Sequence, residues 1–129
     1  MARPRLPRPT DAELEILTVL WSRGPSTVRE ILEEIARTRT TGYTSVLKTL
    51  QIMAGKSLVE RDEVHRVHIY RAALPQEETQ RALVSDLLDR AFNGSAAGLV
   101  MHALASKRAS AEDRALIRKM LKAYELESK

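Results

Sequence analysis

Apolar residues in the first half of the chain recur at helical spacing in three short runs separated by turn residues. The spacing predicts helices over about residues 11–22, 28–36 and 41–55. Thr10 and Glu13 form a capping-box pattern at the start of the first helix. Three short helices joined by short turns are typical of a helix-turn-helix domain.

The pattern changes from helical spacing to alternation after the third run. Val59, Arg61 and Glu63 alternate with Glu60 and Asp62, residues 67–72 alternate again, and Val64, His65 and Arg66 lie between the two segments. This arrangement predicts a two-stranded hairpin with its tip at these three residues. A hairpin after three helices makes the predicted domain winged.

Three further helical patterns follow Pro75, over residues 76–92, 95–106 and 110–126. Three helices in such a short segment form a thin layer that cannot bury all of its apolar stripes, so we expect a second copy of the chain to cover them. The residues predicted to form this dimer interface are Leu83, Leu87, Leu88, Leu99, Leu116, Ile117, Met120 and Leu121.

The expected fold class is therefore mostly α-helical with a small β-hairpin wing. The predicted organisation is a flexible basic arm at residues 1–9, a winged helix-turn-helix domain at 10–74 and a helical dimerisation segment at 75–129. The arm is predicted because its prolines exclude a helix.

Composition narrows the class of protein. The chain has 129 residues and a net charge of +4, and residues 1–74 hold 12 Lys and Arg against 9 Asp and Glu. Such an excess favours polyanionic partners. The chain has no cysteine, which excludes disulfides and thiolate metal sites. No apolar run is long enough to span a bilayer and no signal peptide is evident, so we expect a cytoplasmic protein.

Residues 35–59 include four cations and no carboxylate. At helical spacing, Tyr43 and Ala54 fall with Val46, Leu47, Leu50 and Met53 on an apolar side. The opposite side has Thr44, Ser45, Lys48, Gln51 and Ile52. Hydroxyls, an amide and a cation without carboxylates suit contact with phosphates and base edges in a DNA major groove. The alternative is an ordinary amphipathic helix whose polar side faces water.

The segments TDAELEILTVLW from Thr10, GPSTVREI, GYTSVLKTLQIM, LVERD and HIYRAAL resemble the penicillinase-repressor family of bacterial winged-helix regulators. The resemblance runs from about Thr10 to Leu104. It implies a homodimer that binds a dyad operator, with the third helix in the major groove and the C-terminal helices dimerising. The residues predicted to bind DNA are Arg39, Thr41, Tyr43, Thr44, Ser45, Lys48, Gln51, His65 and Arg66.

The resemblance also implies a release mechanism for the members that respond to β-lactams, in which a membrane metalloprotease cuts the repressor at an Asn-Phe pair. This chain has His102 and Ala103 at that position, so we expect any proteolytic release to use a protease of altered specificity. Copper-sensing members end in a cysteine-rich motif, which the chain lacks.

Three other functions are open to a chain of this kind. A winged helix can bind another protein instead of DNA, since fold does not settle function. A metal sensor could use His65 and His68 with Glu63, but residues three apart on a hairpin point to opposite faces. The sequence contains no phosphate loop, metalloprotease motif or nucleophile beside a base, so we expect neither an enzyme nor a cofactor.

Overall fold

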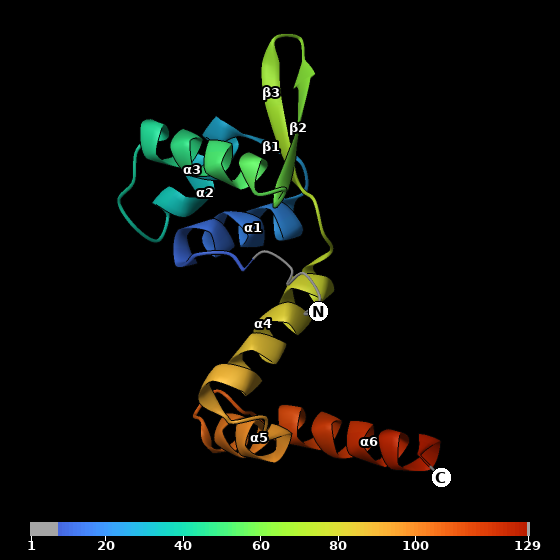
Figure 1. Cartoon of the computed structure of the whole chain (residues 1–129). Coiled ribbons are helices and arrows are strands. Elements are labelled where there is room, and N and C mark those ends of the chain that lie inside the picture. The colour runs from blue at the N-terminus through green and yellow to red at the C-terminus, as the bar shows by residue number, and fades with distance from the viewer. Residues whose placement is uncertain (1–7, 129) are drawn as a thin grey trace. The chain divides into compact units, whose positions relative to one another are not determined.

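Three helices and a three-stranded antiparallel sheet form the first part of the chain in the computed structural model, which describes residues 8–128 (Figure 1). These elements are α1 (Asp11–Arg23), β1 (Ser26–Thr27), α2 (Val28–Ala36), α3 (Tyr43–Gly55), β2 (Val59–Val64) and β3 (Val67–Ala72). The predicted helices and hairpin are confirmed. Strand β1 was not predicted, because a two-residue strand has no periodicity; it pairs with β3 and completes the order β1-β3-β2.

Capping boxes begin two of the three helices. At α1, the Thr10 side chain accepts a hydrogen bond from the Glu13 backbone, and Glu13 accepts one from the Thr10 backbone. Thr27 and Glu30 make the same exchange at α2. Each box satisfies amide groups that the first helical turn leaves without a partner.

The core of this part lies where α1, α2 and α3 meet the base of the sheet. Its buried apolar residues are Ile16, Leu17, Leu20, Val28, Ile31, Ile35, Val46, Leu50, Met53, Leu58, Val59 and Tyr70. Every helix and strand of this part contributes an apolar side chain to the core except β1, whose polar residue Ser26 is buried. The β2–β3 hairpin projects beyond the helices (Figure 1).

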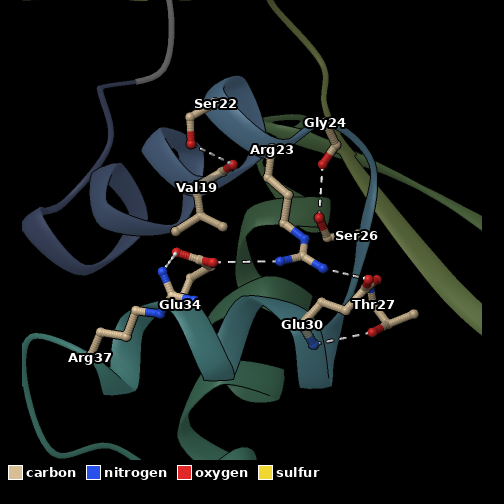
Figure 2. Close-up of polar contacts among 9 residues, drawn as sticks. All are labelled: Val19, Ser22, Arg23, Gly24, Ser26, Thr27, Glu30, Glu34 and Arg37. Carbon is tan, nitrogen blue, oxygen red and sulfur yellow. Dashed lines mark hydrogen bonds and ion pairs between the residues drawn. The ribbon is translucent and has the colours of Figure 1, made fainter.

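Arg23 joins the end of α1 to α2 (Figure 2). Its guanidinium lies 2.7 Å from Glu30 and 3.5 Å from Glu34. Gly24 ends α1 with a φ of 92°, a conformation that favours glycine, and its carbonyl accepts a hydrogen bond from the Ser26 hydroxyl. These contacts set the turn between the first two helices.

Glu13 connects the start of α1 to the end of α3. Its carboxylate is 2% exposed and accepts hydrogen bonds from the Thr10 amide at 2.8 Å and from Lys56 Nζ at 3.0 and 3.1 Å. Burial by itself would raise the pKa of Glu13, but the Thr10 amide and the Lys56 ammonium outweigh it and hold the pKa below its ordinary value of 4.5. The ionised form therefore stabilises the packing of α1 on α3.

The chain divides into two compact units, the first ending at Leu83 and the second beginning at Val84. The second unit consists of the end of α4 (Gln76–Ala91) with α5 (Ala96–Ala105) and α6 (Ala111–Glu127). Its three helices match the predicted ones. The predicted boundary was at Pro75, eight residues before the division between the units, and the first turn of α4 contributes the buried Thr79 to the first unit.

No residue between 84 and 128 is buried. Among the described residues, no helix combines the length and apolar character needed to cross a bilayer. The apolar stripe of α5 is only partly covered: Leu99 and Leu104 are half-buried, whereas Val100 is 44% exposed and Ala103 is exposed. The physical reason is that three helices in one thin layer leave one side of each without a neighbour.

The role of Glu13 predicts a specific dependence of stability on pH. A folded-state pKa below 4.5 means that the ionised carboxylate stabilises the fold above that pH and that this contribution is lost as pH falls through the lowered pKa. We expect Glu13→Gln to reduce the free energy of unfolding by roughly 1 kcal/mol at neutral pH, since Lys56 is partly exposed.

The difference between Glu13→Gln and the parent protein should diminish as pH falls through the lowered pKa of Glu13, because a protonated Glu13 resembles glutamine. Urea denaturation at neutral pH and at a series of acidic pH values measures it. A difference that stays constant over this range would contradict the charged role of Glu13.

Candidate nucleic-acid interface

The outward face of α3 is polar and has no carboxylate. The predicted residues Thr44, Ser45, Lys48 and Gln51 are all exposed on it. The residues that α3 buries are Val46, Leu50 and Met53. Tyr43 and Ala54 were expected on the core side, and this was wrong: both are exposed, because the buried stripe starts after Tyr43 and ends at Met53.

Most of the cations around α3 pair with carboxylates of α1 and α2. Arg39 lies 2.7 Å from Glu15, and hydrogen bonding to this carboxylate raises the pKa of Arg39. Lys56 binds Glu13, and Arg37 lies 3.6 Å from Glu34. Residues 35–59 contain no carboxylate in the sequence, but carboxylates of α1 and α2 lie beside three of their cations in the folded chain. Of its four cations, only Lys48 makes no ion pair with a described residue.

An open groove of about 590 Å³ runs between α3, the start of α2 and the hairpin. Its lining residues are Thr27, Val28, Arg29, Tyr43, Leu47, Gln51, Arg61, Arg66, Val67, His68 and Tyr70. The charged side chains in this lining are arginines, and none of the described residues that line it is acidic. A groove of this charge suits a polyanion.

Strand alternation separates Glu60 and Asp62 of the hairpin from this groove. Arg61 pairs in register with Tyr70, so both lie on the face of the hairpin that borders the groove. Glu60 and Asp62 lie on the opposite face, where Arg71 binds both of them. These two carboxylates raise the pKa of Arg71 and are neutralised by it.

Glu63 is the one carboxylate of β2 on the Arg61 face. It pairs in register with His68, and the His68 Nε2 atom lies 3.9 Å from its carboxylate. Within the described residues, no group of three metal-ligating side chains could hold an ion. The arrangement therefore gives no support to the metal-sensor alternative built on Glu63, His65 and His68.

His65 and Arg66 form the tip of the hairpin with φ values of 50° and 66°. Both residues are in the left-handed region, as a two-residue turn of the I′ type requires, although glycine and asparagine adopt it at lower cost. Arg66 lines the groove, whereas His65 is exposed at the tip and does not line it. Thr41, another predicted residue outside the helix, is half-buried just before α3.

Arg29 and Arg61 belong to the groove but were not predicted as site residues. The alternation of residues 59–63 contained a signal for Arg61, because it separates this residue from Glu60 and Asp62 by face. Arg29 has no comparable signal. It follows the cap of α2, and only the packing of α2 beside α3 and the hairpin brings it to the groove.

The geometry of this part of the chain agrees with comparisons to known proteins. The family model described as penicillinase repressor matches residues 9–123. The transcriptional regulator BlaI of Mycobacterium tuberculosis is 32% identical over 119 residues, which cover 91% of this chain and 85% of the relative.

Two solved structures share the fold of the first part of the chain. The DNA-binding domain of the repressor BlaI has a TM-score of 0.51 and 22% identity, covering 59% of this chain and 93% of that one. The Bacillus licheniformis BlaI monomeric form, solved in complex with the blaP half-operator, has a TM-score of 0.50 and 23% identity, covering 57% and 90%. The predicted winged-helix fold class is confirmed.

Proposed function

The chain belongs to the penicillinase repressor family, and we propose that it is a transcriptional repressor that binds a dyad DNA operator as a homodimer through α3. The observation that carries this proposal is the exposed face of α3, where Thr44, Ser45, Lys48 and Gln51 lie without a carboxylate. Such a helix fits a B-DNA major groove, where hydroxyls, an amide and an ammonium can contact base edges and phosphates.

The second unit supports the homodimer. Its large exposed apolar side chains are Val84, Leu87, Val100, Met101, Leu116, Met120, Leu121, Tyr124 and Leu126. A soluble protein rarely leaves so many large apolar side chains to water, and a second copy of the same helices offers a matching surface. Two copies would present two α3 helices to half-sites about one helical turn apart. Binding of one α3 to its half-site would then raise the effective concentration of the second α3 at the other half-site.

Binding through α3 predicts that Lys48→Ala and Thr44→Ala weaken operator affinity without unfolding the protein. Each lost base-directed contact should cost about 1–3 kcal/mol. Fluorescence anisotropy would measure the affinity for a duplex recovered from DNA fragments that the pure protein retains. Thr18→Ala is a matched control, because its hydroxyl donates to the Leu14 carbonyl on the exposed side of α1.

Equal affinity of all three variants for the selected duplex would reject α3 as the reading element. Retention of no duplex at all would favour the protein-interaction alternative.

Dimerisation through the second unit predicts that Leu121→Asp produces monomers at concentrations where the parent protein is dimeric. An uncompensated charge in a buried apolar interface costs several kcal/mol. Lys122→Asp is the control, since Lys122 lies on the opposite side of α6 from Leu116, Leu121 and Tyr124. Sedimentation velocity distinguishes the two outcomes, and a dimeric Leu121→Asp protein would place the interface elsewhere.

Release from DNA is where this chain departs from the mechanism that the resemblance implies. The bond between His102 and Ala103 lies inside α5, and the His102 ring contacts Phe92 at a centroid distance of 5.7 Å. A protease that binds extended backbone needs α5 to open, and Ala103 has no aromatic ring to fill a specificity pocket.

We therefore expect this bond to remain intact when the protein is co-expressed with a membrane metalloprotease that cuts an Asn-Phe pair. The double variant His102→Asn with Ala103→Phe restores that pair and should be cut. Intact-mass spectrometry measures both. Cleavage of the parent protein at the same rate as the double variant would show that the aromatic residue is not required.

A further inference from the structure

Residues 73–75 connect β3 to α4, and this connector passes beside the end of α1 (Figure 1). Two hydrogen bonds hold its backbone. The Ala73 amide donates to the Leu58 carbonyl at 3.0 Å, which extends the pairing of β3 with β2 by one residue. The Trp21 indole Nε1–H donates to the Leu74 carbonyl at 3.1 Å, across 53 residues of sequence. The second bond attaches the connector to α1.

This attachment depends on the indole N–H more than on packing. An open groove of about 440 Å³ lies between the two segments, with Leu20, Trp21 and Pro25 on one side and residues 71–75 on the other. Trp21 is half-buried and packs against the core. Within residues 8–128, no other hydrogen bond joins α1 to the connector.

The start of α4 follows directly from the connector. The Pro75 carbonyl accepts hydrogen bonds from the amides of Glu78 and Thr79 at 3.1 and 3.4 Å, so the helix begins at once. Thr79 is 5% exposed, which means that the first turn of α4 is buried in the first unit. The position of the Leu74 carbonyl therefore decides where α4 begins on this unit.

We propose that Trp21 is a positioning residue for DNA recognition: its indole N–H fixes the start of α4 on the first unit, and thereby the half-site spacing that the homodimer accepts. This inference rests on the proposed function, in which the C-terminal helices join two copies of the first unit. Trp21 acts through Leu74 and α4 rather than by touching DNA, since it belongs neither to α3 nor to the groove beside α3.

The length of α4 makes a small displacement at its start consequential. With 16 residues, α4 is roughly 24 Å long at a rise of 1.5 Å per residue. A change of about 10° in its starting direction moves its far end by about 4 Å. This exceeds the rise of one base pair, which is about 3.4 Å. A hydrogen bond confines its donor and acceptor to a few tenths of an ångström, so it can exclude such a change.

Trp21→Phe tests the proposal, because it removes the N–H and keeps an aromatic ring. The probes are duplexes with two half-sites of the selected operator at its own spacing and at spacings one base pair shorter and longer. Fluorescence anisotropy with the full-length protein measures the affinities. We expect the parent protein to prefer its own spacing by roughly tenfold and Trp21→Phe to prefer it by about twofold, because a loosely held α4 lowers the gain from binding both half-sites. A preserved preference would overturn the proposal.

Leu74→Ala is the matched control. It keeps the carbonyl that accepts the indole hydrogen bond and removes the side chain from the same groove. It should retain the spacing preference of the parent protein. An equal loss in Leu74→Ala would assign the effect to packing of the connector and would contradict a role for the N–H.

Two further measurements separate positioning from a general structural role. Urea denaturation gives the stability of each variant, and a duplex with one half-site gives the affinity of a single α3. A merely structural role predicts that Trp21→Phe loses stability and half-site affinity together. The positioning role predicts unchanged half-site affinity with a weaker spacing preference.

A second replacement covers the case in which Trp21→Phe does not fold. Trp21 is the only tryptophan of the chain, so biosynthetic incorporation of benzothienylalanine replaces it alone. This amino acid has the shape of tryptophan with sulfur in place of the N–H, so it removes the donor without leaving a cavity. A weaker spacing preference in this protein supports the proposal, and the parent preference contradicts it.

Failure of this inference is distinguishable from failure of the proposed function. If the parent protein binds no duplex, the proposed function is wrong and the role of Trp21 falls with it. If the parent protein binds every spacing equally well, DNA binding stands and the start of α4 does not set the spacing. If both replacements of Trp21 keep the preference of the parent protein, the homodimer stands and the indole N–H has no part in it.

Discussion

The buried carboxylate of Glu13 is the contact on which the geometry of the first unit depends. It closes the first turn of α1 through Thr10 and holds the end of α3 through Lys56. An ionised group that is 2% exposed is tolerated only because an amide and an ammonium satisfy it. By attaching one end of α3 to α1, this contact helps to orient the helix so that Val46, Leu50 and Met53 face the core and the polar side faces outward.

Carboxylates and cations form ion pairs elsewhere in the first unit as well. The acids of α1 and α2 neutralise the cations that flank α3 in sequence, including Arg39 and Lys56. Arg71 neutralises two acids on the outer face of the hairpin. Positive charge without a paired carboxylate then remains beside α3, in a groove whose arginines come from α2, β2 and the tip of the hairpin. Most of this unpaired positive charge thus comes from elements other than α3.

The second unit differs from the first, because exposed apolar side chains rather than unpaired cations distinguish its surface. Its helices are capped locally, as at Ser110 and Asp113, so each is well defined in the single chain. Their apolar stripes nevertheless remain partly or fully exposed, and residues 84–128 contain no buried side chain. Defined helices with uncovered stripes are what the homodimer that we propose would need for its interface.

The sequence by itself determined the helices, the hairpin and the polar face of α3. These features depend on neighbours within a few residues. The capping boxes join residues three apart, and the side-chain patterns of helices and strands each repeat within about four residues. Only the tertiary structure decided that β1 pairs with β3, that Arg39 and Lys56 form ion pairs with carboxylates of α1, and that Arg29 lines the groove. The ion-pair partners lie 24 and 43 residues apart. Contacts over such separations depend on how the helices pack, which local periodicity does not encode.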